Sequence, residues 1–324
     1  MSMLTTGYSG NELLDAFADA CVELEEWGFR SAPRGQAVYE LLNYGIQVNN
    51  PRQRLVNHEA RKLPYRYLLG ELCFYLSASN SSEFISAYSP FWKSITKEDG
   101  TVNSGYGHRI FGKSERVGLV DQWALVKNIL KADKDSRQAI INIHVPEDRI
   151  EASRDLPCTL SLQFFIRPNK DGQDSLYMIV NMRSNDLIKG FTIDFFQFSM
   201  LQEILTLELR EFYPDLKLGT YYHNAGSFHV YEPDFQLIKD VVHEHENNVP
   251  PSLTMPEMQV SDLASIPNLL SLETKFRKTL IDKTVTFDVE SDDDYKQLST
   301  YWKTLVDICF LKRHNLLEQW KDSK

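Results

Sequence analysis

Residues 158–166 read Cys-Thr-Leu-Ser-Leu-Gln-Phe-Phe-Ile, and apolar side chains alternate with polar ones along most of this stretch. Leu160, Leu162 and Phe164 fall on the same side of a two-residue period as Cys158. That period is the signature of a β-strand whose two faces meet different surroundings. The stretch therefore predicts a strand with one buried face, and it places a cysteine at the start of that strand.

Further strand and helix patterns surround this stretch. The apolar run 176–182 predicts a second strand. Apolar residues recur at helical spacing in six segments, which are 11–27, 64–76, 121–131, 195–213, 267–280 and 295–309. The mixture predicts an α/β protein. After Pro250-Pro251 the pattern is helical, so we predict a main domain over 1–250 and a helical C-terminal extension over 251–324.

Composition excludes some classes of protein. The 324 residues are 42% hydrophobic and 25% charged, as in soluble globular proteins with material for a core. There are 35 Lys and Arg against 45 Asp and Glu, a formal net charge of −10. A field of this sign repels phosphate backbones, so we expect no direct binding to nucleic-acid duplexes. A small anionic ligand is still compatible with it, because a few arginines in a cleft can hold a phosphate.

Membrane segments and metal sites are not expected. No stretch approaches the ~18 consecutive apolar residues of a membrane helix, and the start shows no secretory pattern, so we expect a cytoplasmic protein. The four cysteines lie far apart without a Cys-X-X-Cys pair, which is typical of free thiols. His243-Glu244-His245 lacks the i, i+4 spacing of a helical zinc pair, and we interpret it as a solvated face.

Several polar residues lie where burial is expected. Arg183, Asn185 and Asp186 follow directly on the apolar run 176–182. Asp194 lies within Phe-Thr-Ile-Asp-Phe-Phe, where a lone carboxylate costs several kcal/mol unless a partner meets it. A bound ligand is one such partner. A cysteine at a strand end with arginines nearby is also a candidate nucleophile, because neighbouring positive charge stabilises the thiolate.

The residues then match a known family in several short runs. In chain order these are Pro33-Arg34-Gly35, Gly70-Glu71-Leu72, Asn103-Ser-Gly-Tyr106-Gly107, Asp121-Gln122, Asp135-Ser-Arg137, Leu156-Pro-Cys158-Thr159, Met182-Arg-Ser-Asn-Asp-Leu-Ile-Lys-Gly190 and Gly226-Ser-Phe-His-Val-Tyr231. Each is weak alone, but together and in this order they resemble the thymidylate synthase family. Within it, the chain looks most similar to the deoxycytidylate 5-hydroxymethyltransferases. The resemblance implies a large mixed β-sheet flanked by helices, a homodimer, and a catalytic role for the main domain.

The resemblance also implies catalytic roles. Cys158 matches the thiolate that adds to carbon 6 of a pyrimidine and makes carbon 5 nucleophilic towards the one-carbon unit of 5,10-methylenetetrahydrofolate. Glu71 matches a glutamate that organises proton transfer around the base and the folate, and Tyr106 an active-site tyrosine beside the nucleophile. Asp186 matches the carboxylate that holds the pterin of the folate.

Substrate-binding roles follow in the same way. Arg34, Arg183 and Ser184 match residues that hold the nucleotide phosphate. Arg137 matches an arginine that relatives lend across the dimer interface to the other subunit's phosphate. His229 and Tyr231 match the pair that binds the sugar hydroxyl.

Position 194 distinguishes the base in this resemblance. Relatives that act on uracil carry Asn, whose amide accepts from the ring N–H and donates to the carbonyl at carbon 4. Cytosine reverses that pattern, so a carboxyl that accepts from the amine and shares a proton with ring nitrogen 3 fits it better. Asp194 therefore favours conversion of dCMP to 5-hydroxymethyl-dCMP, with water rather than hydride completing the reaction.

Other functions stay open at this stage. Cytidylate hydroxymethylation and methylation of dUMP by a thymidylate synthase are the nearest alternatives. A catalytically silent nucleotide-binding protein is a further one. Two departures from the family pattern favour it: Gln138 stands where many relatives have a second arginine, and the end of the sequence lacks a recognisable tail that closes over the folate.

Overall fold

A mixed β-sheet forms the centre of the protein. The computed structural model describes residues 8–10, 12–112, 121–149 and 154–321. In this part of the chain the sheet has eight strands in the order β1-β3-β8-β6-β5-β4, with β2 paired to β3 and β7 to β8. The strands are β1 (Tyr8–Gly10), β2 (Phe29–Ser31), β3 (Val38–Val48), β4 (Ile140–Asn142), β5 (Thr159–Pro168), β6 (Asp174–Met182), β7 (Asn185–Asp186) and β8 (Lys217–Tyr231). The pairs β1–β3, β6–β8 and β7–β8 are parallel and the others antiparallel.

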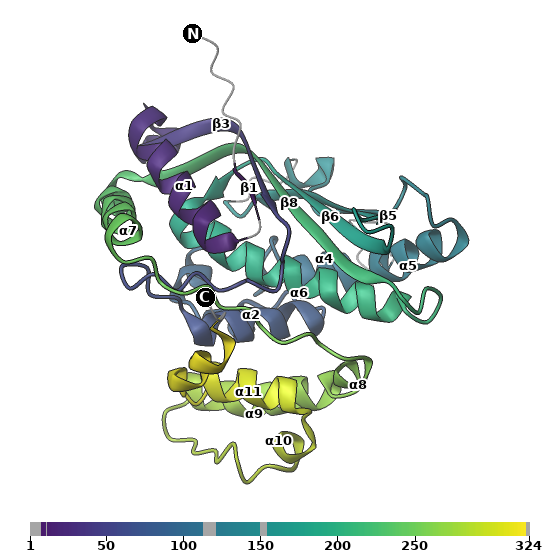
Figure 1. Cartoon of the computed structure of the whole chain (residues 1–324). Coiled ribbons are helices and arrows are strands. Elements are labelled where there is room, and N and C mark those ends of the chain that lie inside the picture. The colour runs from purple at the N-terminus through teal and green to yellow at the C-terminus, as the bar shows by residue number, and fades with distance from the viewer. Residues whose placement is uncertain (1–7, 11, 113–120, 150–153, 322–324) are drawn as a thin grey trace.

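Helices flank this sheet (Figure 1). They are α1 (Leu13–Trp27), α2 (Tyr65–Leu76), α3 (Ser82–Ser86), α4 (Tyr106–Phe111), α5 (Gln122–Ala132), α6 (Thr192–Leu209), α7 (Phe235–Asn247), α8 (Val260–Leu263), α9 (Ile266–Ile281), α10 (Asp293–Gln297) and α11 (Thr300–Cys309). The expected fold class, a large mixed sheet with flanking helices, is confirmed. No described helix is both long enough and apolar enough to span a bilayer.

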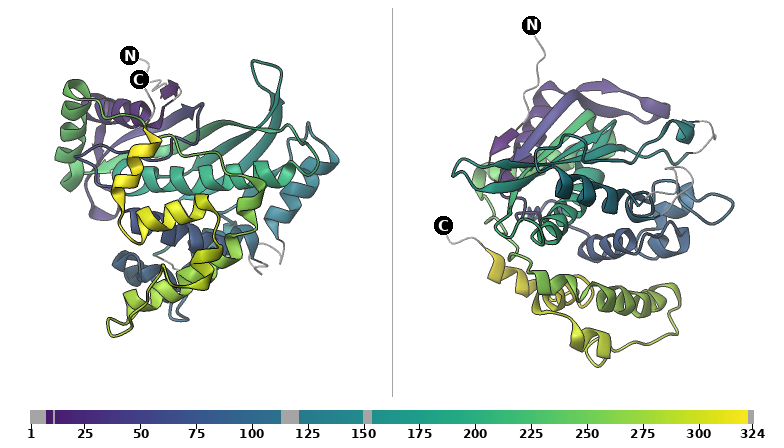
Figure 2. Two further views of the ribbon diagram at one scale, coloured as in Figure 1. Left: turned by 60° about the horizontal axis from the view of Figure 1, so that its bottom comes forward. Right: turned by 90° about the vertical axis from the view of Figure 1, so that its right-hand side faces the viewer.

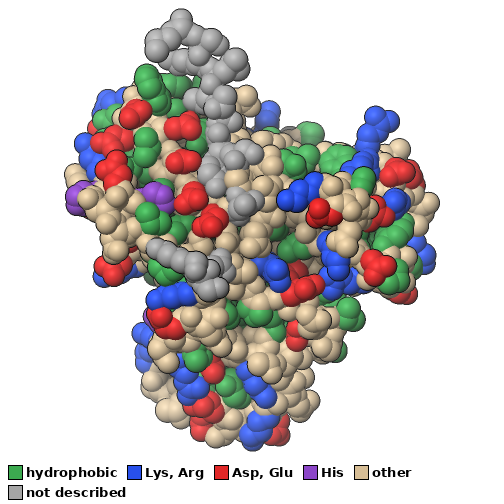
Figure 3. All heavy atoms as spheres, in the orientation of Figure 1, with side chains coloured by type: hydrophobic (Ala, Val, Ile, Leu, Met, Phe, Trp, Pro, Cys, Tyr) green, Lys and Arg blue, Asp and Glu red, His purple; other side chains and the backbone are tan. Residues whose placement is uncertain are grey.

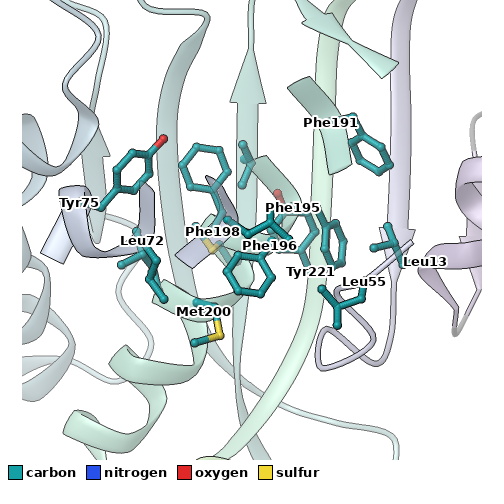
Figure 4. Close-up of a cluster of buried hydrophobic side chains, with 14 of the residues drawn as sticks. Leu13, Leu55, Leu72, Tyr75, Phe191, Phe195, Phe196, Phe198, Met200 and Tyr221 are labelled. Carbon is teal, nitrogen blue, oxygen red and sulfur yellow. The ribbon is translucent and has the colours of Figure 1, made fainter. Parts of the chain in front are cut away.

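Helix α6 is the middle layer. Its residues are buried on all sides, as expected for a helix without a polar face. The sheet covers one side of α6 and α2 the other, and α9 and α11 form an outer layer beyond α2 (Figures 1 and 2). Figure 4 shows the resulting core: Phe195, Phe196 and Phe198 of α6 lie between Leu72 of α2 and Tyr221 of β8.

The strand that opened the sequence analysis has a β-bulge at its start. Thr159 pairs with Met182, but Ser161 pairs with Asn181, so Leu160 is an extra residue in β5. The alternation beyond it is as predicted. Leu160 itself, expected on the buried face, is 36% exposed, because the bulge shifts the pleat by one residue. Cys158 directly precedes β5 and the bulge.

Other boundaries were not predicted from the sequence. The longest strands, β3 and β8, were missed because their apolar alternation is interrupted by tyrosines, glycines and two histidines that the sheet nevertheless accommodates. The run 295–309 is not continuous: α10 ends and Ser299 caps α11 by accepting from the Trp302 N–H. The family run Asn103–Gly107 leads into α4, which begins at Tyr106 with Gly105 as its N-cap.

Helices α1 and α7 pack together at one end of the sheet (Figure 1). Helix α1 contributes several of the acidic residues behind the net charge of −10, and Figure 3 shows acidic side chains gathered over it. Its inner face, including Leu14, Phe17 and Leu24, is buried. One face of the helix thus belongs to the core while the other carries charge.

The C-terminal helices pack directly on α2. Tyr88, which follows α3, donates to Glu273 of α9 at 2.7 Å, and the rings of Phe276 and Phe310 stack with centroids 4.3 Å apart. The backbone N–H of Thr254 donates to the Trp320 carbonyl at 2.8 Å, so the chain returns to the point where this region begins. The division at residue 250 stays a prediction from the sequence pattern, and we expect both parts to unfold together because their apolar residues form one contiguous cluster.

Replacing Trp302 with alanine tests this expectation. The side chain is fully buried and its indole N–H donates to the Asp262 carbonyl at 2.9 Å. Its loss should lower the free energy of unfolding by about 3–5 kcal/mol. Urea unfolding followed by circular dichroism should show a single transition at lower urea. Val260→Ala, at a side chain 57% exposed, serves as the control and should change little. Two separate transitions in Trp302→Ala would show that the extension unfolds on its own.

Candidate active site

Cys158 lies at the entrance to β5, half-buried, beside a guanidinium group. The Arg183 Nη2 is 3.5 Å from the Cys158 Sγ. The same guanidinium donates to the carbonyls of Leu156 and Pro157 at 2.9 and 3.0 Å, which fixes it against the segment that leads into the cysteine. Burial raises the pKa of the Cys158 thiol, whereas the charges of Arg183 and Arg34 oppose that effect and favour the thiolate.

Tyr106 holds the backbone on either side of this sulfur. Its hydroxyl oxygen accepts from the N–H groups of Cys158 and Thr159 at 3.1 and 3.2 Å, so its own proton remains to be donated elsewhere. Gly107 brings α4 this close to α2, because a Cβ at that position would lie 2.1 Å from the Tyr75 carbonyl oxygen. Tyr106 thus lies beside Cys158, the candidate nucleophile.

Asp194 lies in the first turn of α6 with its carboxyl among apolar neighbours. The Asn185 Nδ2 donates to its Oδ2 at 2.7 Å. Burial raises its pKa to about 7, the hydrogen bond from Asn185 opposes this, and the charge of Asp186 adds to it. The partner of this carboxyl is thus a side chain from β7 and not the backbone of its own turn.

Glu71 is a second buried carboxyl near Asp194. It lies on α2 and is 5% exposed, so this glutamate does not face solvent. Tyr67 donates to Oε1 at 2.8 Å, and Gln197 of α6 donates to Oε2 at 3.1 Å. Burial, followed by the charge of Asp194, raises the pKa of Glu71 to about 8. Near neutral pH this carboxyl therefore keeps its proton.

Asp186 and His229 lie opposite each other in the parallel pair β7–β8. Asp186 caps a turn of π-helix over Leu187–Phe191 by accepting from the Lys189 N–H, and it makes no ion pair with Arg183. Its Oδ2 and the His229 Nδ1 are buried without a hydrogen-bond partner among the described residues. Tyr231 packs edge-on against His229 with ring centroids 5.4 Å apart. Unpartnered buried polar atoms in one place indicate a ligand that would satisfy them.

The remaining predicted residues are more exposed. Arg34 is exposed in the turn Pro33–Gly35 with φ 55°, a left-handed conformation uncommon outside glycine, and its charge acts on both Cys158 and Tyr231. Ser184 is half-buried between β6 and β7. Arg137 is exposed, and its carbonyl accepts from Gln163 at 3.0 Å. Within a single chain the structure does not bring Arg137 to the others, so its predicted role across a dimer interface stays untested.

The comparisons with known proteins agree with this geometry. A model of the thymidylate synthase family matches residues 16–272. The chain belongs to the thymidylate synthase family. The match includes Cys158 and the other predicted site residues, and it also runs past residue 250 into α9.

Three relatives illustrate the range of activities in this family. The deoxyuridylate hydroxymethyltransferase of Bacillus phage SP01 is 27% identical over 237 residues, which are 70% of this chain and 59% of that protein. The thymidylate synthase of Bacillus phage phi3T is 25% identical over 66% of this chain and 76% of its own length. The deoxycytidylate 5-hydroxymethyltransferase of Enterobacteria phage T4 is 29% identical over 53% of this chain and 69% of its own. The aligned part thus spans less than two thirds of the SP01 protein.

Sequence reasoning missed several polar residues around this thymidylate synthase-family site. Tyr67 and Gln197 hold Glu71, and Asn185 holds Asp194. Asn185 had been noted as a polar residue after an apolar strand, but without a role. Within the described residues no group of three or more His, Cys, Asp or Glu side chains is arranged to hold a metal. The interpretation of 243–245 as a solvated face is wrong for Glu244, which accepts from the backbone of Glu59 and Ala60 at 2.8 and 3.0 Å.

The buried carboxyls predict a defined pH dependence of stability. Burial raises the pKa of Glu71 from the ordinary 4.5 to about 8. Between these values the unfolded chain loses this proton while the folded protein keeps it, so stability present below pH 4.5 is lost as pH rises towards 8. The free energy of unfolding of the wild type, relative to Glu71→Gln, should therefore fall through this window and level off above it.

Urea unfolding of both proteins at about pH 5, 6, 7 and 8 measures this difference. Glu26→Gln, at an exposed glutamate of α1, is the matched control and should give a constant difference from the wild type. A Glu71→Gln protein whose difference from the wild type does not change with pH would contradict the assignment of a protonated Glu71.

Proposed function

We propose that this protein is a one-carbon transferase that converts dCMP, 5,10-methylenetetrahydrofolate and water to 5-hydroxymethyl-dCMP and tetrahydrofolate. The observation that carries the proposal is a half-buried cysteine held 3.5 Å from a guanidinium group, with the buried carboxyl of Asp194 close enough to act on its pKa. A thiol, a cation that stabilises its thiolate, and a protonatable carboxyl are what nucleophilic addition to a cytosine ring requires.

Cys158 is the proposed nucleophile. Its thiolate adds to carbon 6 of the base, which places the electron pair at carbon 5 and makes that carbon nucleophilic. Arg183 stabilises the thiolate before addition, and Tyr106 keeps the backbone around it in place. Carbon 5 bonds to the one-carbon unit and loses its own hydrogen as a proton, tetrahydrofolate departs and water supplies the hydroxyl. The sulfur–carbon bond then breaks and the thiolate is regenerated.

Asp194 is the proposed partner of the cytosine ring. With a pKa of about 7 it exchanges a proton near neutral pH, so it can share one with ring nitrogen 3 while it accepts from the exocyclic amine. Protonation of the ring makes carbon 6 more electrophilic. The same group therefore selects the base and assists the addition.

Glu71 is the proposed group that manages protons and water. Its carboxyl is neutral near pH 7 and is fixed by Tyr67 and Gln197. A protonated buried acid can donate a proton to the base or to the departing tetrahydrofolate. As a carboxylate it can then orient the water that supplies the product's hydroxyl. A water molecule rather than hydride distinguishes hydroxymethylation from methylation.

Asp186 is the proposed binding group for the folate, together with Glu71. Its buried Oδ2 has no hydrogen-bond partner among the described residues, which fits the N–H donors on the edge of a pterin ring. When bound, 5,10-methylenetetrahydrofolate would supply the one-carbon unit. The carboxyl oxygens that this chain offers thus fit the co-substrate that the family uses.

The phosphate and sugar have separate proposed partners. Arg34, Arg183 and Ser184 are proposed to hold the phosphate, because guanidinium groups suit that ligand and the charges of Arg34 and Arg183 both act on Cys158. His229 and Tyr231 are proposed to bind the sugar hydroxyl, and the His229 Nδ1 is free for it among the described residues. The partner subunit's Arg137 would complete the phosphate site in a homodimer. A cytoplasmic location is part of the same proposal.

Product analysis tests the proposal directly. The purified protein, methylenetetrahydrofolate and either dCMP, CMP or dUMP are incubated, and the nucleotides are weighed by mass spectrometry. We expect a hydroxymethyl group on dCMP, and we expect tritium release from carbon 5 that Cys158→Ser lowers by at least about a thousandfold. Cys309→Ser, at a buried cysteine of α11, is the matched control and should retain turnover.

Other products would contradict it. A methyl or hydroxymethyl group on dUMP alone would show an activity like that named for the phi3T or SP01 relative. A wild type that binds nucleotide but releases no tritium would show a catalytically silent protein.

Mixing two inactive variants tests the role of Arg137. We expect Cys158→Ser and Arg137→Ala to be inactive or weak alone, yet a mixed dimer contains one site with an intact cysteine facing an intact arginine. Random reassortment should then restore about a quarter of wild-type activity, because half of the dimers carry one complete site. The control pair is Cys158→Ser with Arg183→Ala. Arg183 contacts Cys158 within one chain, so that mixture should recover nothing. Equal behaviour of the two mixtures would overturn a role across subunits.

A further inference from the structure

A line of buried side chains leads from the sheet to Asp194. The Tyr221 hydroxyl is 3.0 Å from the His223 Nδ1, the His223 Nε2 is 3.0 Å from the Asn185 Oδ1, and the Asn185 Nδ2 donates to the Asp194 Oδ2 at 2.7 Å. Tyr221, His223 and Asn185 are each at most 2% exposed. We call these four residues the Asp194 network. None of its first three members touches the proposed nucleophile.

The network has a direction, which the chemistry of its members fixes. Burial lowers the pKa of His223 to about 3, so the imidazole is neutral and carries a single N–H. Asn185 donates through Nδ2 to Asp194, so its Oδ1 faces His223 and requires the N–H at Nε2. His223 Nδ1 then accepts a hydrogen bond from the Tyr221 hydroxyl. Burial raises the pKa of Tyr221 well above its ordinary value, so this hydroxyl keeps its proton. Every bond thus donates towards Asp194.

Packing holds the members in these positions. Phe191 meets the His223 ring edge-on with centroids 5.1 Å apart, and Phe195 packs on Tyr221 at 4.4 Å (Figure 4). Gly190 leaves room for the last bond, because a Cβ there would lie 2.8 Å from the Asn185 Nδ2 and 3.4 Å from the Asp194 Oδ2. Gly190 belongs to a π-helical turn, a feature frequent at functional sites.

The direction matters because a neutral carboxyl is ambiguous. It has one O–H donor and one acceptor oxygen, and the proton can lie on either oxygen. With the proton on the oxygen that faces ring nitrogen 3, the carboxyl matches cytosine; with the proton on the other oxygen, it matches uracil. A carbonyl-type oxygen accepts better than a hydroxyl oxygen. Donation from Asn185 to Oδ2 therefore keeps the proton on Oδ1.

We propose that Tyr221, His223 and Asn185 are positioning residues that make Oδ2 of Asp194 the fixed acceptor and Oδ1 the oxygen that shares the proton. In this arrangement Oδ2 accepts from the exocyclic amine of cytosine and Oδ1 faces ring nitrogen 3. Uracil presents the opposite order and is disfavoured. The inference rests on the proposed function and assigns its base specificity to residues on the sheet.

Several other groups act on the same carboxyl and enter any pH-dependent measurement. They are Glu71, Tyr67 and Tyr75 from α2, Tyr106 from α4, Cys158 beside β5 and Asp186 of β7. Comparison of variants that leave these groups unchanged isolates the contribution of the network.

Tyr221→Phe is the decisive variant, since it removes one oxygen and keeps the ring that packs on Phe195. Without the Tyr221 proton, His223 can carry its own proton on Nδ1. Nε2 then becomes an acceptor, Asn185 turns over, and Asp194 must donate from Oδ2. Asn185→Leu breaks the network at its last bond. Thr206→Val is the control, because its buried hydroxyl on α6 donates to the Gln202 carbonyl outside the network.

The readout is the dissociation constant of dCMP and of dUMP, each measured by calorimetry in a Cys158→Ser background across a pH series. Tyr221→Phe and Asn185→Leu should each lower the preference for dCMP by about tenfold, and the pH midpoint of dCMP binding should move upward. Thr206→Val should change neither. The kcat/KM ratio of the two nucleotides, with Cys158 restored, should shift in the same direction.

Two results separate failure of the inference from failure of the proposed function. In the first, the parent protein binds dCMP preferentially, and both network variants keep that preference or weaken the binding of both nucleotides equally. The network then does not set specificity, and only the further inference is contradicted. If the parent prefers dUMP, or if the wild type makes no hydroxymethyl-dCMP, the proposed function falls and the inference falls with it.

Discussion

The burial of α6 is the constraint on which the rest of the structure depends. This helix has no polar face, so it is stable only when the sheet covers one side and α2 the other. That sandwich brings the first turn of α6, with Asp194, beside the middle of α2, with Glu71 (Figure 1). Two carboxyls that are 123 positions apart in number thus meet in one apolar environment because two helices must cover each other.

The same arrangement determines the chemistry. Desolvation is expensive for a charge and cheap for a neutral acid, so both carboxyls hold their protons to higher pH than they would in water. Three of their four oxygens, Glu71 Oε1, Glu71 Oε2 and Asp194 Oδ2, accept from a hydroxyl of α2 and from amides of α6 and β7. Such groups destabilise a fold unless they are satisfied. They cluster beside Asp186 Oδ2 and His229 Nδ1, which have no hydrogen-bond partner among the described residues, and this combination indicates a ligand site.

Much of the site was accessible from the sequence. The two-residue period predicted β5 and placed Cys158 at its entrance, and the short runs around Arg34, Glu71, Tyr106 and Arg183 indicated the family that the comparison with residues 16–272 shows. The features that the sequence did not predict are the bulge at Leu160, the break before Ser299 and the two long strands β3 and β8. Each depends on pairing or capping partners far along the chain, and a periodic pattern carries no information about them.

By itself, the sequence determined the fold class and the family and indicated which side chains to propose as reactive, because these follow from the residue types present and their order. Only the tertiary structure decided how those side chains behave. Whether Glu71 faces solvent or a second carboxyl, and whether Asn185 is a bystander or the donor that orients Asp194, depends on which atoms surround them. Protonation and hydrogen-bond direction are properties of an environment assembled from β7, β8, α2 and α6, and no single segment contains that environment.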